Sequence, residues 1–412
     1  MRISTSQTYR QGIKPITDHQ VSLAKVQEQI SSGRKILQPK DDPTNSARLM
    51  ELHKQLTMND QYGRNITLAN GRLATEEGAL QQGGDILQRA RELNIQANSA
   101  ALTDENRQSI AVEVRQLRQQ LQDIANTKDS EGAYLFAGFK EQSTPFTLNA
   151  NGDVIYNGDQ GQRQLKIGPS RQIAVGDAGD DVFMNIRNNN GQFQVATSAN
   201  NKGSGVISTG SVTDSVAFQN SFMGHDYRID FTVNGANTTF NVIEVTNGID
   251  NPTPVVNNQA YVAGQSISFR GMEVSISGTP FDDDKFTVEP SQNQSLFKTL
   301  DDLINALETP TKTAPEQAAL TQSLANSLAD IDQGMLHLNQ IRGKAGSRMN
   351  SLDAQDAVNQ TFDVQLQSLM GDIGAVNYAE AASQMNAELL GLQAAQQSFV
   401  KIQNLSLFNY LR

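Results

Sequence analysis

The 412-residue sequence contains no cysteine and no tryptophan. Without cysteine there can be no disulfide bonds, thiol nucleophiles or thiolate metal sites, and the redox compartment stays open. Basic residues are also scarce, because 33 Lys and Arg stand against 44 Asp and Glu, giving a net charge of -11. A chain of this sign repels phosphate backbones, so we expect no nucleic-acid partner.

Long apolar runs are missing as well. No stretch approaches the roughly 18 uncharged apolar residues that a membrane-spanning helix needs. Residues 1–20 also lack the apolar segment of a secretory signal peptide. We therefore expect no membrane insertion and no cleaved signal. The cytoplasm is then the default location, unless the protein leaves the cell through a machine that reads no cleaved signal.

Proline is absent from residues 44–144 and 316–412. Because helix interiors exclude proline, both stretches can be helical. Apolar residues recur within them at heptad spacing, which is typical of long helices that pack lengthwise. The repeat is formed by Ile66, Leu73, Leu80 and Leu87 in the first stretch and by Leu324, Leu328, Ile331, Met335 and Leu338 in the second.

Residues 143–297 show a different pattern. Residues 226–233 alternate between polar and apolar side chains, as in a half-buried strand, and the segment holds 14 of the 24 aromatic residues. Asn-Gly pairs, which favour type I′ hairpin turns, begin at residues 151, 157, 190, 234 and 247. These features predict an inserted all-β domain.

The order of helices, strands and helices predicts an α+β multidomain fold. We expect a long antiparallel, coiled-coil-like helical bundle built from both chain ends, with the all-β domain inserted at its far end. The expected domains are terminal axial-core helices over 1–42 and 370–412, a helical bundle core over 43–142 and 298–369, and the β domain over 143–297.

Both chain ends carry apolar residues that a monomer would leave uncovered. The N-terminal stripe is thin and is interrupted by Gly12 and Pro15, whereas the C-terminal tail is densely apolar. Apolar surfaces of this kind mark places that another chain covers. The predicted assembly residues are Ile13, Leu23, Val26, Ile30, Tyr378, Met385, Leu389, Leu392, Phe399, Ile402, Leu405 and Leu407.

Motifs for catalysis or metal binding are weak. The four histidines, at 19, 53, 225 and 337, lack metal-ligand spacing. The run 282–284 of three aspartates lacks the other positions of a calcium loop, so we interpret it as a polar hairpin turn. Nucleophile-elbow and nucleotide-binding glycine motifs are also missing. We therefore predict no enzyme, metal or cofactor, while catalytic carboxylates in the β domain stay an open alternative.

Asp41 and Asp42 stand immediately before Pro43 and the first long helical stretch. Carboxylates favour a helix N-terminus, because they accept hydrogen bonds from its free amide groups and oppose its dipole. We interpret this pair as a helix cap rather than as a paired-acid site.

Several motifs near the chain ends resemble the flagellin superfamily. They are the Ser-Ser-Gly turn at 31–33 followed by the Asp-Asp helix start at 41–42, and the segments 87–93, 123–127, 341–346 and 377–381. Pro43, Arg34, the segment 134–138 and the chain end 406–411 depart from the usual filament subunit and are similar to the hook-associated protein 3 family. The resemblance marks as family-motif residues Ser32, Gly33, Asp41, Asp42, Pro43 and Arg342.

This resemblance implies an extracellular structural subunit of the bacterial flagellum. Such a subunit would be exported unfolded through the flagellar type III apparatus, with the help of a cytoplasmic export chaperone. It would form a homo-oligomeric ring that joins hook-associated protein 1 to the flagellin filament. Three alternatives remain: a flagellin filament subunit, a glycan-binding or hydrolytic protein whose helices serve as a stalk, and a cytoplasmic coiled-coil scaffold, which the apolar C-terminus disfavours.

Overall fold

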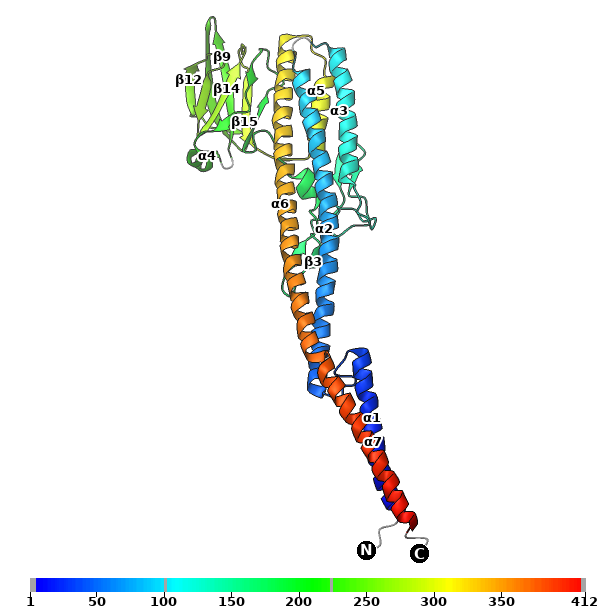
Figure 1. The fold of residues 1–412 in the computed structure, drawn as a ribbon. Coiled ribbons are helices and arrows are strands. Elements are labelled where there is room, and N and C mark those ends of the chain that lie inside the picture. Colours follow the sequence, from blue (N-terminus) through cyan, green and yellow to red (C-terminus); the bar gives the residue numbers. More distant parts are fainter. Residues whose placement is uncertain (1–4, 100–101, 223–224, 409–412) are drawn as a thin grey trace. The chain divides into compact units, whose positions relative to one another are not determined.

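The computed structural model describes residues 5–99, 102–222 and 225–408. The chain divides into two compact units: unit 1 comprises residues 1–65 and 354–412, and unit 2 comprises residues 66–353. Along the sequence, long helices precede and follow a central β region (coloured green in Figure 1). The predicted α+β fold, with an antiparallel helical bundle and inserted strands, is confirmed.

Long helices dominate both ends of the chain. The helices are α1 (Thr5–Ser32), α2 (Pro43–Ala97), α3 (Asp104–Ala125), α4 (Ser215–Phe222), α5 (Leu296–Glu308), α6 (Ala314–Gly374) and α7 (Tyr378–Phe408), with a single π-helical turn η1 (Asp180–Met184). The heptad pattern identifies the buried face correctly, because Leu73, Leu80 and Leu87 of α2 are fully buried. In unit 2, α2, α3, α5 and α6 share one apolar core.

Short antiparallel strand pairs lie close to these helices. They are β1 (Phe146–Leu148) with β2 (Val154–Tyr156), β3 (Gln164–Lys166) with β4 (Gln172–Ala174), and β5 (Ile186–Arg187) with β16 (Asn293–Gln294). The last pair is the neck where the chain enters and leaves the larger sheets.

Two larger antiparallel sheets form the rest of the β region. One has the order β11-β10-β9-β15-β6, with β12 also pairing with β10, and the other has the order β13-β14-β7, with β8 also pairing with β14. Their strands are β6 (Phe193–Thr197), β7 (Val206–Ile207), β8 (Ser211–Val212), β9 (Asp226–Asn234), β10 (Asn237–Thr246), β11 (Ile249–Asp250), β12 (Val256–Ala260), β13 (Ser266–Phe269), β14 (Met272–Ser277) and β15 (Lys285–Pro290). Side chains from both sheets meet in a core of their own.

The expected β domain over 143–297 contains residues from two different cores. Phe146 and Phe183 pack into the helical core of unit 2 together with Phe297, which lies in α5. The separate core of the two sheets begins at Phe193 and ends at Val288. The domain bounds stay a prediction, and this packing favours a narrower β domain.

The turn prediction is right at one Asn-Gly pair. Asn247 and Gly248, between β10 and β11, have φ values of 53° and 78°, both positive as a type I′ turn requires. The other four pairs lack a positive φ at the asparagine, so the prediction of a type I′ turn is wrong at those pairs. At Asn190, for example, the side chain instead accepts hydrogen bonds from the amides of Gln192 and Phe193.

Helix α1 continues through Gly12 and Pro15, the two residues that interrupt its apolar stripe. A proline inside a helix costs about 3 kcal/mol because it removes a backbone hydrogen bond and crowds the preceding turn. Packing of α1 against α7 over this region offsets that cost.

Candidate assembly surface

The apolar stripes of α1 and α7 pack against each other within unit 1. The two helices run antiparallel side by side (Figure 1). The rings of Tyr9 and Phe399 meet edge to face at 5.4 Å. A Cβ atom at Gly12 would lie 2.7 Å from the Phe399 ring, so glycine at this position makes room for it. Part of the predicted assembly surface is therefore covered within the chain.

A polar contact accompanies this packing further along the pair. The Nδ1 atom of His19 lies 2.6 Å from Oε2 of Glu388. Gly391 lies directly beneath the imidazole, where a Cβ atom would come within 2.8 Å of the ring. Small residues thus let the two helices approach closely at two separated points.

The chain between α1 and α2 is tied to the end of α6. Lys35 donates its backbone N–H to the carbonyl of Gly374 at 2.8 Å, and Val376 donates to the carbonyl of Gly33 at 3.0 Å. Gly33 has a φ of +69°, in the left-handed region that favours glycine. The family-motif glycine therefore has a backbone role that the sequence alone did not reveal.

We expect Gly33→Ala to lower the free energy of unfolding of unit 1 by about 1 to 2 kcal/mol, because a side chain disfavours the left-handed conformation. The new Cβ atom would also lie 3.3 Å from the hydroxyl of Tyr378. Denaturant unfolding and amide hydrogen exchange would measure the change.

The matched control is Gly371→Ala, in helix α6 of the same unit, where a Cβ atom meets nothing within 4 Å. It should be neutral or stabilise by about 0.5 to 1 kcal/mol, since alanine is the better helix former. Equal effects of the two substitutions would contradict the role given to Gly33.

The Asp41–Asp42 motif organises the start of α2. Asp42 accepts a hydrogen bond from the backbone N–H of Asn45 at 3.0 Å, which confirms the predicted helix cap. Pro43 follows as the first residue of α2, a position where a missing N–H costs nothing. The hydrogen bond from the Asn45 backbone N–H, followed by one from the Asn45 side chain, holds the pKa of Asp42 below its ordinary value.

Asp41 does not cap α2, so the helix-cap interpretation is wrong for this residue. It bonds instead to α1 and to the loop before α2. It lies 2.7 Å from the Lys25 ammonium of α1 and accepts the backbone N–H of Gln38 at 3.0 Å. The Lys25 hydrogen bond, followed by that from Gln38, lowers the pKa of this carboxyl. The other family-motif residues form local contacts: Ser32 donates its hydroxyl to the carbonyl of Glu28, and Arg342 contacts Glu77 at 2.6 Å within unit 2.

The structure divides the predicted assembly residues by exposure. Val26 is buried, and the half-buried members are Ile13, Leu23, Ile30, Met385, Leu392 and Phe399. Tyr378 and Leu389 are exposed, at 60% and 37%. The side chains of Ile402, Leu405 and Leu407 lie outside the described residues.

Other large apolar side chains in unit 1 are more exposed than most of the predicted set. Leu390 is 70% exposed, and Tyr9, Val21, Met50, Val358, Val364 and Val400 are also exposed. The apolar density of the tail was visible in the sequence, but it did not separate the face that meets α1 from the face that is free.

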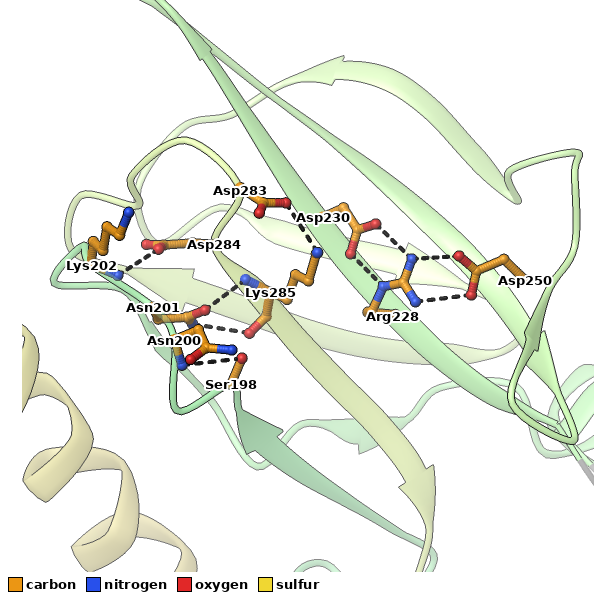
Figure 2. A network of polar contacts seen from close by, with 10 residues as sticks. All are labelled: Ser198, Asn200, Asn201, Lys202, Arg228, Asp230, Asp250, Asp283, Asp284 and Lys285. Atoms are coloured by element: carbon orange, nitrogen blue, oxygen red, sulfur yellow. Dashed lines mark hydrogen bonds and ion pairs between the residues drawn. The ribbon is translucent and has the colours of Figure 1, made fainter.

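The acidic residues of the β region were the basis of the glycan-binding or hydrolytic alternative. Figure 2 shows that Arg228 bridges two of them, contacting Asp230 at 2.7 and 2.9 Å and Asp250 at 2.9 and 2.8 Å. Arg228 lowers the pKa of Asp250. These carboxylates connect β9 to β11 and are already paired with a cation.

The run of aspartates at 282–284 forms a polar turn, as predicted. The turn is not a hairpin, because the strands that flank it, β14 and β15, belong to different sheets. Asp283 has a φ of 68° and lies 3.0 Å from the Lys285 ammonium. Asp284 is buried and accepts backbone N–H groups of Lys202 at 2.7 Å, Gly203 at 3.0 Å and Phe281 at 2.7 Å. Its contact with Lys202 is drawn in Figure 2. The turn thereby fixes the loop that follows β6.

Among the residues that the structure describes, neither histidines nor carboxylates gather in groups of three or more suited to a metal ion. In the same residues, no helix is sufficiently long and apolar to span a bilayer.

Comparison with known proteins places this architecture in a family. Residues 3–141 match the model of the bacterial flagellin N-terminal helical region, and residues 196–290 match that of a flagellar hook-associated protein 1, D2-like domain. The crystal structure of flagellar hook-associated protein 3 from Legionella pneumophila is 32% identical, with a TM-score of 0.74, and the alignment covers 79% of this chain and 98% of that one. The chain belongs to the hook-associated protein 3 family.

Other members of the hook-associated protein 3 family agree with this assignment. The structure of FlgL from Xanthomonas campestris is 31% identical, with a TM-score of 0.70, over 78% of this chain and 99% of that one. Flagellar hook-associated protein 3 of Escherichia coli K12 is 33% identical over 189 residues, which is 46% of this chain and 59% of that protein. The chain thus spans about three fifths of the length of this curated relative. The resemblance to the flagellin superfamily is confirmed, and these relatives are structural flagellar proteins.

Proposed function

We propose that this chain is a structural subunit of the junction between the flagellar hook and filament, and that it assembles as a homo-oligomeric ring. The observation that supports this function best is the similarity to hook-associated protein 3 over 98% of that chain. One face of the ring would meet hook-associated protein 1 and the other would meet flagellin. Contacts between unlike faces of successive subunits allow a ring to present two different surfaces.

The free apolar surface of unit 1 supports assembly through the helices α1 and α7. Tyr378, Leu389 and Leu390 expose large apolar side chains on α7. Burying such a side chain between subunits contributes roughly 1.5 to 3 kcal/mol, repeated at each subunit of a ring. We retain the predicted assembly residues of α1 and α7 as this proposed interface, apart from Val26, which is already buried within the chain, and we add Leu390 to it.

The proposal includes export in an unfolded state through the flagellar type III apparatus, with a cytoplasmic chaperone, to a site outside the cell. The absence of cysteine suits such export, because an unfolded chain then cannot cross-link. We propose no catalytic activity, since Arg228, Lys285 and backbone amides hold the carboxylates of Figure 2.

We expect Leu390→Asp to block assembly while leaving the folded monomer intact. The side chain is 70% exposed, so a charge there meets water in the monomer but would be buried in the ring. Cells with this variant should lose filaments and release flagellin into the medium. Electron microscopy and immunoblotting of the medium would measure both, and thermal unfolding of the purified chain would test the monomer.

The matched control is Asn386→Asp, one turn earlier on α7 and also exposed. It adds the same charge and removes no apolar group, so filaments should persist. Normal filaments with Leu390→Asp would contradict the proposed interface.

A further inference from the structure

A polar cavity of about 430 Å³ lies in unit 2 between α5, α6 and the neck of the β region. Its lining includes two carboxylates, Asp302 of α5 and Asp330 of α6, with Gln294 and Asn189 at the neck. Among the described residues that line it there is neither an aromatic ring nor a basic side chain. A sugar would lack a stacking surface and a phosphate would lack a counter-charge, whereas oxygen-rich walls suit a hard cation.

Three oxygen atoms converge on the end of the Gln294 side chain. Its terminal amide nitrogen lies 3.1 Å from Oγ1 of Thr299 and 3.4 Å from Oδ2 of both Asp302 and Asp330. A primary amide has two hydrogens, so it cannot satisfy three acceptors with a full hydrogen bond each. Rotating the amide by half a turn would place its carbonyl oxygen there and gather four oxygens.

The spacing of these atoms suits a calcium ion. With metal–oxygen bonds of about 2.4 Å, neighbouring ligands at right angles lie about 3.4 Å apart. Magnesium needs bonds of about 2.1 Å, which bring its ligands closer together. Of the separations around Gln294, the two of 3.4 Å match the calcium value, and the one of 3.1 Å lies between the values for the two ions.

Asn189 supplies an independent sign that the cavity takes a ligand. Its side chain lines the cavity and is only 3% exposed, yet its Oδ1 atom has no hydrogen-bond partner among the described residues. Its backbone N–H donates to Oδ1 of Asp330 at 2.5 Å, which holds the two residues together. A buried oxygen without a donor is costly, and a cation or its bound water would satisfy it.

We propose that Asp302, Asp330, Thr299 and Gln294 form a calcium site, with Asn189 as a further oxygen ligand directly or through water. Water would complete the six to eight oxygens that calcium takes. The ion would connect the neck of the β region to α5 and α6. The proposal is independent of the function proposed above.

One cation lies beside the proposed site. The Lys298 ammonium contacts Asp302 and would share that carboxylate with the ion.

The test is a titration of the full chain with calcium chloride after treatment with a chelator. Isothermal calorimetry should show one calcium ion per chain, with a dissociation constant on the order of 10⁻⁴ to 10⁻³ M, as in extracellular calcium modules. Thermal unfolding should shift upward by a few degrees at about ten times that concentration. Absence of saturable binding, or tighter binding of magnesium, would overturn the assignment.

Two substitutions locate the site. Asp330→Asn and Thr299→Val should each weaken binding, the former at least tenfold because it removes a charged ligand. The control is Asp332→Asn on the same helix, whose carboxylate pairs with Arg91 at 2.7 Å and should not affect calcium. Unfolding of each variant without calcium shows that it folds. Unchanged binding in Asp330→Asn, or an equal loss in Asp332→Asn, would overturn the proposal.

Discussion

Glu76→Gln is expected to raise the free energy of unfolding by roughly 3 to 5 kcal/mol at about pH 9 and to change it little at about pH 5. Glu76 lies on α2 and is only 1% exposed. One carboxylate oxygen accepts the backbone N–H of Asp177 at 2.9 Å, and the other has no hydrogen-bond partner among the described residues. Glutamine keeps the shape of this side chain without a charge.

The cause is the cost of ionising a carboxyl group in this position. Burial raises the pKa of Glu76 to about 8, and the neighbouring charge of Asp177 adds to the effect. The guanidinium groups of Arg348 and Arg72 oppose this, but they are already engaged with Asp177 and with Asp129 respectively. Glu76 is thus protonated in the folded chain at neutral pH.

The sign of the pH dependence follows from the two states. In the unfolded chain the pKa has its ordinary value of about 4.5, so folding takes up a proton between about pH 4.5 and pH 8. The contribution of Glu76 to stability is fully present below about pH 4.5 and is lost as the pH rises through about 8. The slope reaches about 1.4 kcal/mol per pH unit. Asp330, with a pKa of about 6, titrates at lower pH than Glu76, whose pKa is about 8.

Denaturant unfolding at several pH values between about 6.5 and 9 would measure the slope. Glu77→Gln is the control, because Glu77 is a partly exposed neighbour that pairs with Arg342. It should cost no more than about 1 kcal/mol, with the wild-type pH slope retained. A Glu76→Gln protein with that same slope would show that Glu76 is not protonated in the fold.

The helices were predictable because two independent signals agreed. Proline exclusion bounded the long helical stretches, and heptad spacing selected Leu73, Leu80 and Leu87 as the buried face of α2. The cap at Asp42 was also local, since it depends on a hydrogen bond to Asn45 three residues away. Features that depend on residues close together in the sequence were therefore predicted correctly.

Features that depend on contacts between residues far apart in the sequence were not predicted. Periodicity identifies apolar positions on α7 but does not show that Phe399 meets Tyr9 while Leu390 faces solvent. Arg270 and Gly271 form a hairpin turn with φ values of 50° and 79°, although arginine is not a typical turn residue. The pairing of β13 with β14 imposes this conformation.

The β region shows the same limit at the scale of domains. Polar and apolar residues that alternate with a period of two predict strands, but this pattern does not show which core the buried side chains enter. The strands from Phe193 onward enclose their own core, whereas Phe146 and Phe183 lie against Phe297 of α5. A sequence boundary at 143 therefore falls before residues that belong to the helical core.

Two replacements of the β region by a short Gly-Ser linker should give opposite results. Replacing residues 190–290 should leave the helical core folded, because the neck already brings the two ends together. Asn188 donates its backbone N–H to the carbonyl of Gln292 at 3.0 Å, and Arg187 pairs with Asn293. Gln322 and Asn326 would lose their partners in β7 and β6 and would bond to water instead.

Replacing residues 143–297 should unfold the helical core. This change removes the aromatic side chains of Phe146, Phe183 and Phe297, all fully buried among the helices. Truncating one such side chain costs about 3 to 5 kcal/mol, so losing three approaches or exceeds the roughly 5 to 15 kcal/mol of a typical domain. Far-ultraviolet circular dichroism during thermal unfolding would measure both proteins. A cooperative helical transition in the longer replacement would show that residues 143–189 and 291–297 do not belong to the helical core. Its absence in the shorter replacement would show that the helical core depends on the two sheets.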